Sequence, residues 1–376
     1  MTTLKNLTIY LENEIIKDGY ITFDRHIIEI GQGDCDGIDM AGKLLIPGFI
    51  DQHIHGAYGS DVMDALEHSL ETMSQSLPLE GTTSYFATTM TETSDGIKNA
   101  LASVKTYIET NQKPGAELLG VHLEGPFISK TYKGAQRLDA ISDPSISLFD
   151  MYNKASGYNI KQVTLAPETK DALPLIKHLN QLNIVASIGH SDASYDVTQE
   201  AITAGASLFT HGYNAMRPLH HRDLGVVGAM LLHEETYAEL ICDFVHTSKP
   251  AAKLLYKNKG KDRLILITDA MRAKGLKDGV YNLGGQHVIK KGLEARLEDG
   301  TLAGSVLKMD DAVKNFKTLT NASIETIIAV ASANPAKLHR IFDRKGSIAV
   351  GKDADFIIID EDINIYETYC LGIRCY

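Results

Sequence analysis

The chain has 376 residues, of which 44% are hydrophobic and 23% are charged, and its formal net charge is −11. This length is sufficient for a barrel domain of roughly 250 residues with a smaller companion, and for a core that needs no disulfide. The negative charge argues against a nucleic-acid partner, because phosphate backbones bind to basic faces.

The four cysteines form no CxxC pair, so they predict neither a disulfide framework nor a zinc ribbon. The N-terminal segment has no basic region followed by an apolar run, and no stretch of ~18 apolar residues occurs in the chain. We therefore expect no signal peptide and no membrane span, and predict a cytoplasmic protein.

Both ends of the chain have the pattern of short strands. Residues 1–47 alternate apolar and polar positions, with a turn signal at Asp18-Gly19, and residues 346–360 have the same character. We predict a small β-sandwich domain formed by residues 1–47 and 345–376. The alternative is that these strands are edge strands of the main domain.

The sequence of the middle of the chain, residues 48–344, predicts an α/β domain. Apolar runs typical of strands recur with helical patterns between them, at residues 44–50, 82–86, 118–123, 162–165, 184–188, 207–210, 239–242 and 264–268. Near-continuous apolar strands that alternate with helices are typical of a parallel sheet covered on both sides. Eight such units predict a (β/α)8 barrel of the TIM type.

Polar side chains follow seven of the eight apolar runs. In such barrels the chemistry lies at the C-terminal ends of the strands. In chain order these side chains are His53, His55, Glu124, Glu168, His190, His211, Asp243, His246 and Asp269. We therefore expect one polar site at the mouth of the barrel.

His53 and His55 are two positions apart, so on a strand both side chains point to one face and can reach one metal ion. Imidazole nitrogens and carboxylate oxygens suit Zn²⁺ or Fe²⁺. Asp269 follows the apolar segment LILIT and is the natural group to move a proton beside such a metal. The alternative for Asp269 is a helix cap, but the residues after it are a poor helix start. No GxSxG elbow, phosphate-binding loop or GxGxxG fingerprint competes with this hypothesis.

The motifs at the strand ends resemble those of the N-acetylglucosamine-6-phosphate deacetylase family of amidohydrolases, and the resemblance extends over the whole chain. HLEGP together with THxxNAM is specific to this branch, whereas HxH belongs to the superfamily. The matching segments are PGFIDQHIHG (47–56), HLEGPFIS (122–129), VTLAPE (163–168), GHSDA (189–193), THGYNAM (210–216), DFVH (243–246), ITDAM (267–271), LAGS (302–305), SANPAKLHRI (332–341) and GSIAVGKDADFIIID (346–360).

The resemblance implies a divalent metal, held by Glu124, His190 and His211. His53 and His55 match the pair that holds a second metal in some members, with Glu124 bridging, so one or two metals per subunit are expected. Asp269 matches the family's catalytic acid and base. The implied reaction is the removal of acetate from N-acetylglucosamine 6-phosphate.

The resemblance also implies the substrate contacts, and a homodimer in which Arg222 of one subunit reaches the phosphate in the other. A guanidinium suits a phosphate, since it forms bidentate charge-assisted bonds. The alternative for Arg222 is an ordinary solvated loop residue. The remaining implied substrate contacts are Gln136, Asn214, Ala215, His246, Leu302, Ala303 and Gly304.

Two positions depart from the family pattern. Gln136 stands where many members have histidine, and Phe244 stands where many have glycine. These changes leave deacetylation of the galactosamine epimer open as an alternative. Another amidohydrolase activity is a second alternative, although Glu168 stands where a carboxylated lysine would be needed in some of those enzymes. A metal-free scaffold is a third, although every matched ligand is present.

Overall fold

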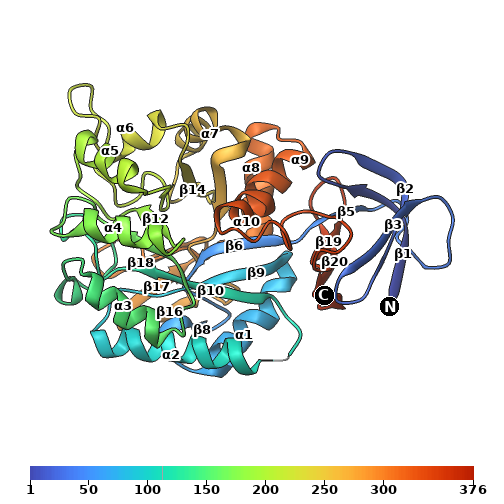
Figure 1. The fold of residues 1–376 in the computed structure, drawn as a ribbon, viewed down its shortest axis with the longest axis horizontal. Coiled ribbons are helices and arrows are strands. Elements are labelled where there is room, and N and C mark those ends of the chain that lie inside the picture. Colours follow the sequence, from blue (N-terminus) through green and yellow to red (C-terminus); the bar gives the residue numbers. More distant parts are fainter. Residues whose placement is uncertain (112) are drawn as a thin grey trace.

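The computed structural model describes residues 1–111 and 113–376. Figure 1 shows an α/β barrel and, beside it, a small sheet that contains both ends of the chain. The predicted fold class, a (β/α)8 barrel with a small β domain from both termini, is confirmed. Among the described residues, none of the helices combines the length and the apolar character that crossing a bilayer requires.

Eight parallel strands form the barrel: β6 (Phe49–Ile54), β9 (Thr82–Thr88), β10 (Glu117–Glu124), β11 (Ile160–Leu165), β12 (Val185–Ile188), β13 (Leu208–Phe209), β14 (Tyr237–Ile241) and β15 (Leu264–Ile267). They pair in chain order. At the end of the sheet, the Asp269 N–H donates to the His53 carbonyl oxygen (2.8 Å), and the His55 N–H donates to that of Ala270 (2.9 Å). These bonds join β15 to β6 at the barrel mouth.

Helices cover the outer face of the barrel, as Figure 1 shows. In α4 the buried side chains are Ala172, Leu175, Ile176 and Leu179, a spacing that places them on one stripe facing the sheet. Helix starts carry side-chain caps; Ser194, for example, caps α5 by accepting from the Val197 N–H. The helices are α1 (Glu67–Ser76), α2 (Ser94–Thr110), α3 (Ile146–Ala155), α4 (Ala172–Gln181), α5 (Tyr195–Ala204), α6 (Gly225–Leu232), α7 (Lys249–Arg263), α8 (Met309–Thr320), α9 (Ile324–Ile328) and α10 (Asn334–Leu338).

The small sheet contains β1 (Thr2–Tyr10), β2 (Ile15–Phe23), β3 (Ile27–Gln32), β4 (Ile38–Asp39), β5 (Leu44–Pro47), β19 (Phe356–Ile359), β20 (Ile365–Cys370) and β21 (Ile373–Arg374). Its order is β21-β20-β19-β5-β1-β2-β3, and β4 pairs with β1. The rings of Phe23 and Phe356 lie 5.0 Å apart although two strands separate β2 from β19. The sheet therefore curls around a core of its own. The domain boundaries after residue 47 and before residue 345 stay a prediction.

The predicted run at residues 44–50 consists of two strands that belong to different sheets. β5 pairs with β1 and β19 in the small sheet, whereas β6 is a barrel strand. The chain passes between them at Gly48, where a Cβ atom would lie 2.2 Å from the side chain of Thr83. β6 then continues to Ile54, so His53 lies inside the strand and His55 directly after it.

Short elements surround the barrel mouth. A three-stranded antiparallel sheet follows β15 in the chain, and it was not predicted. The Gln286 side chain at its first turn donates to the Ala135 carbonyl oxygen (2.6 Å), so this sheet lies against the loop that contains Gln136. The short elements are β7 (Gly56–Ala57), β8 (Ser60–Asp61), β16 (Gly279–Leu283), β17 (Gln286–Lys291), β18 (Glu294–Leu297), the 3-10 turns η1 (Val62–Asp64), η2 (Leu77–Glu80) and η3 (Leu138–Ala140), and the π-helical segment η4 (Ala329–Ala333).

Candidate metal centre and active site

Glu124, His190 and His211 converge at the ends of three barrel strands, and all three are buried. Glu124 Oε1 lies 3.3 Å from His190 Nε2 and 3.2 Å from His211 Nε2, and the two nitrogens are 3.1 Å apart. Unprotonated nitrogens this close repel each other unless a cation lies between them. Tetrahedral zinc, with bonds of about 2.0–2.2 Å, spaces its ligands about 3.3 Å apart. The three side chains therefore fit a divalent cation.

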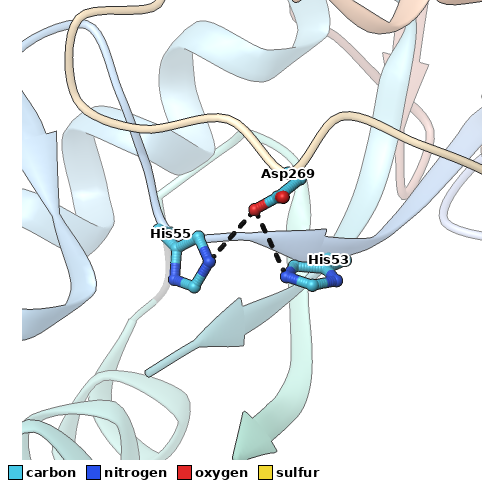
Figure 2. A group of neighbouring side chains, drawn as sticks. All are labelled: His53, His55 and Asp269. Atoms are coloured by element: carbon cyan, nitrogen blue, oxygen red, sulfur yellow. Dashed lines mark ion pairs between the residues drawn. The ribbon is translucent and has the colours of Figure 1, made fainter. Parts of the chain in front are cut away.

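A second group contains His53, His55 and Asp269, and Figure 2 shows both rings facing the carboxylate. Asp269 Oδ1 lies 3.4 Å from His53 Nε2 and 3.1 Å from His55 Nε2. His53 Nε2 is buried and has no hydrogen-bond partner among the described residues. A buried nitrogen in this position normally has a ligand to bind, so this group also fits a cation.

Glu124 lies between the two groups. Its Oε1 faces His190 and His211, while its Oε2 lies 3.2 Å from His55 Nε2. One carboxylate can thus contribute an oxygen to each group. This arrangement is the geometry expected of a bridging ligand.

Hydrogen bonds outside the two groups orient the ligand nitrogens. His190 Nδ1 lies 2.9 Å from the Tyr132 carbonyl oxygen, which can only accept, so the ring proton is on Nδ1 and Nε2 is free toward Glu124. His53 Nδ1 lies 3.0 Å from a carboxylate oxygen of Glu239. Sequence reasoning missed Glu239, although a charged residue inside an apolar strand was the available signal.

The strand-end residues have an unusual backbone conformation. His190, His211 and Asp269 have φ values of 48°, 33° and 48°, a region that non-glycine residues rarely adopt. Such strain costs on the order of 1–3 kcal/mol and gathers at functional sites. It turns all three side chains toward the same point at the mouth of the barrel.

The carboxyl group of Asp269 is held in its ionised form. Burial alone would raise its pKa, but when the two rings are protonated, the positive charge of His53 and the hydrogen bond from His55 outweigh burial and lower the pKa to about 2. A carboxylate at this position can bind a cation or accept a proton from water.

A cavity of about 310 Å³ opens above the two groups. This volume is within the range of small-molecule sites. Among the residues that the structure describes, no lysine or arginine lines it. Its lining contains the predicted residues His55, Glu124, Gln136, His190, His211, Asn214, Ala215, His246, Asp269, Leu302 and Gly304, and also the unpredicted residues Met90, Thr131, Tyr132, Gly134, Ala135, Leu283 and Thr301.

Gln136 lines the cavity, but both ends of its amide are already bonded. Its carbonyl oxygen accepts from the Thr91 N–H (2.7 Å), and its NH₂ donates to Glu124 Oε2 (2.9 Å). Its observed contacts therefore orient Glu124. Whether it also contacts substrate stays a prediction.

His246 is oriented by Asp243, whose Oδ2 lies 2.6 Å from His246 Nδ1. Burial lowers the pKa of His246, but the hydrogen bond and charge of Asp243 outweigh burial and raise it above its usual value. A protonated ring with Nδ1 bonded to Asp243 has its Nε2–H left to donate.

Three other predicted positions lie around the site in different ways. Ala303 is fully buried and is not among the lining residues, whereas its neighbour Gly304 does line the cavity. Gly304 has a φ of 64°, and a Cβ there would lie 3.2 Å from the Asp269 carbonyl oxygen. Arg222 is exposed on the loop before α6 and lies outside the cavity, where its side chain contacts His221.

Phe244 does not line the cavity. Its ring packs against the main core, with the ammonium of Lys249 4.8 Å from the ring centre. Its φ is 62°, the conformation that glycine adopts most easily. The backbone conformation at this position therefore suits the glycine of the family pattern, and nothing in the structure explains the phenylalanine.

The Amidohydrolase family model matches residues 44–373. The N-acetylglucosamine-6-phosphate deacetylase of Bacillus subtilis (strain 168) is 46% identical over 378 residues, covering 98% of this chain and 96% of the relative. The N-acetylgalactosamine-6-phosphate deacetylase of Escherichia coli O157:H7 is 37% identical over 330 residues, covering 88% of this chain and 87% of that relative.

A solved structure of a relative has the same fold as this chain. A mutant of the N-acetyl-D-glucosamine-6-phosphate deacetylase from Mycobacterium smegmatis, in complex with N-acetyl-D-glucosamine-6-phosphate, superposes with a TM-score of 0.93 at 27% identity. The match covers 100% of this chain and 99% of the other. On the evidence of its strand-end histidines and carboxylates, its barrel and these relatives, the chain belongs to the amidohydrolases and, within them, to the N-acetylglucosamine-6-phosphate deacetylase family.

Proposed function

We propose that the protein hydrolyses the amide of N-acetyl-D-glucosamine 6-phosphate to D-glucosamine 6-phosphate and acetate. The observation that carries this proposal is the convergence of two ligand groups at the floor of one cavity, one of which contains Asp269, with Glu124 between them. The family relationship identifies the substrate, since the relative in the solved complex binds this sugar phosphate.

The two groups are proposed to hold two divalent cations, Zn²⁺ or Fe²⁺, in each subunit. Nitrogen and carboxylate donors in sets of three favour these ions, and a catalytic site keeps a position open for water or substrate. A bound cation supplies Lewis acidity, which makes water a nucleophile near neutral pH and polarises a carbonyl group.

The chain's own residues move the proton and hold the substrate. Asp269 accepts a proton as the water oxygen attacks the acetyl carbon, and it returns the proton to the nitrogen as the C–N bond breaks. His246 donates its Nε2–H to the substrate, at the carbonyl oxygen or at a sugar hydroxyl. Gln136 keeps Glu124 in place, since its amide is bonded to that carboxylate.

The substrate's phosphate needs positive charge from outside this cavity. Asn214 and Ala215 line the wall and are proposed to offer polar backbone groups. Arg222 is exposed and lies outside the cavity, so it is available to reach a second subunit. We therefore propose a homodimer with two-fold symmetry in which each Arg222 binds the phosphate in the partner's site.

We also propose a cytoplasmic location. All four cysteines are free thiols, as is usual where thiols are kept reduced.

The reaction is tested by measuring amine release from N-acetylglucosamine 6-phosphate, from the unphosphorylated sugar and from the galactosamine epimer, with zinc-loaded enzyme. We expect release from the phosphorylated glucosamine derivative, and loss of it in Asp269→Asn. Asp343→Asn is the matched control, because Asp343 is exposed and does not line the cavity, and we expect full activity from it.

Each other outcome has a distinct meaning. A preference for the galactosamine epimer would support the alternative substrate. Equal activity on the unphosphorylated sugar would refute the role proposed for Arg222. A protein with bound metal and no activity on any of the three would refute the deacetylase assignment.

A further inference from the structure

Glu239 is a fully buried carboxylate in the interior of the barrel, on β14. Its Oε1 accepts from the amide nitrogens of Gln52 (2.7 Å) and Gln162 (3.1 Å). Its Oε2 lies 3.0 Å from His53 Nδ1 and accepts from the His211 N–H (3.1 Å). Four donors therefore surround one anion, two on each oxygen.

The contact to His53 determines which ring nitrogen can bind a cation. A carboxylate oxygen only accepts, so Nδ1 carries the proton and Nε2 is left with its lone pair when the ring is neutral. This Nε2 lies 3.5 Å from Glu124 Oε1 and 3.4 Å from Asp269 Oδ1. Glu239 thus aims the ligand nitrogen of His53 at the centre of its group.

The same oxygen, Glu239 Oε2, also contacts His211, which belongs to the other metal group. The backbone N–H of His211 is fixed by Glu239 Oε2, at a residue whose φ of 33° is intrinsically unfavourable. The ring of His211 extends from this fixed backbone to Glu124 Oε1. One carboxylate oxygen therefore holds a member of each group.

We propose that Glu239 is a positioning residue. It fixes His53 and His211, one member of each metal group, relative to each other, and it keeps the ring proton of His53 on Nδ1 so that Nε2 can bind a cation. The proposal rests on the proposed role of the two groups in binding metal. Partners behind metal-ligating histidines typically change metal affinity 10–100-fold when they are removed. Glu239 itself does not line the cavity.

A purely structural role makes a different prediction. Glu239 also connects β14 to β6 and β11 through Gln52 and Gln162, and that connection could simply stabilise the barrel. Gln162 provides the control, since it donates to Glu239 and, among the described residues, forms no side-chain hydrogen bond with a member of either metal group. Replacing it with leucine removes one donor from the carboxylate and leaves the bonds to His53 and His211 intact.

The test is a Zn²⁺ titration of metal-stripped full-length protein against a chromophoric chelator, for the wild type, Glu239→Gln and Gln162→Leu. We expect Glu239→Gln to bind zinc about 10–100-fold more weakly, with the larger loss at the His53 group. We expect Gln162→Leu to bind as the wild type does. Equal affinity in Glu239→Gln and wild type, or an equal loss in both variants, would overturn the proposal.

A second measurement needs no variant, in case Glu239→Gln does not fold. In zinc-loaded wild-type protein with ¹⁵N-labelled histidine, NMR should show His53 protonated at Nδ1 and unprotonated at Nε2. A proton on Nε2 would overturn the role of Glu239. A wild type that takes up neither Zn²⁺ nor Fe²⁺ would overturn the proposed function together with this inference, whereas a zinc-loaded wild type with an equally loaded variant would overturn only the inference.

Discussion

A buried ion pair stabilises the segment that follows Asp269, and breaking it should cost several kcal/mol. Lys274 and Glu80 are both fully buried, and their side chains form a salt bridge. Glu80 also accepts from the Met309 N–H (3.2 Å). The pair thus joins the loop after β15 to the segment before β9, and the bond from Met309 adds the start of α8.

We predict that Lys274→Met destabilises the protein by about 3–5 kcal/mol at pH 8, because it leaves the Glu80 carboxylate without its cation. Unfolding a chain of 376 residues carries an entropy of about 0.8 kcal/mol per kelvin, so the melting temperature should fall by roughly 4–6 °C. Burial already raises the pKa of Glu80 to about 7 against the opposing effect of Lys274. In the variant Glu80 can therefore take up a proton, and the loss should be smaller at pH 6.

The double variant Lys274→Met/Glu80→Leu tests the reasoning, since replacing both members of a buried pair by apolar groups is often nearly neutral. Thermal unfolding is followed by far-UV circular dichroism, as the chain has no tryptophan. The expected result is a double variant that melts close to the wild type and well above Lys274→Met. Losses in Lys274→Met and in Glu80→Leu that simply add in the double variant would refute the proposed coupling.

Three further predictions concern single side chains. Both ring nitrogens of His339 are buried beside the ring of Phe86, without a hydrogen-bond partner in the part of the chain that the structure describes, and burial lowers its pKa to about 3. Its contribution to stability should therefore be complete above pH 6.5 and fall as the pH falls toward 3, by about 2.7 kcal/mol at pH 4.5. Urea unfolding of His339→Leu should show a flatter pH profile, and an unchanged profile would contradict this. Phe244→Gly should leave the ratio of activities on the two sugar epimers unchanged, since Phe244 lies outside the cavity; a changed ratio in amine-release assays would place it in the specificity site. Gln136→Leu should lower the zinc affinity about 10–100-fold, because Glu124 loses the hydrogen bond that orients it. An unchanged affinity in the chelator titration would show that Gln136 does not orient Glu124 for metal binding.

Much of the barrel could be predicted because its strands are buried on both faces. β12, β13 and β15 have only buried residues, and their sequences VASI, LF and LILI are nearly continuous apolar runs. The strand-end positions of His190, His211 and Asp269 followed from those runs. The positive φ angles that turn these side chains together could not be predicted, because they depend on the packing of the whole mouth.

Other features depend on contacts that no local pattern contains. The apolar run at residues 44–50 does not show that its two halves enter different sheets, because both halves are buried and only the Pro47-Gly48 pair marks the break. The amide of Gln136 meets Thr91 and Glu124 only after the barrel has closed. The family resemblance suggested a substrate contact for Gln136, whereas its observed partners are a backbone N–H and a carboxylate.

The curled sheet has a consequence for biosynthesis. β5 is paired on one side with β1, but its other neighbour, β19, is made roughly 310 residues later. At a ribosomal rate of about 5–20 residues per second, that edge stays open for tens of seconds. During this interval the N-terminal strands present unpaired backbone groups to other nascent chains. Completion of β19 is thus the event that protects the newly made enzyme from edge-to-edge association.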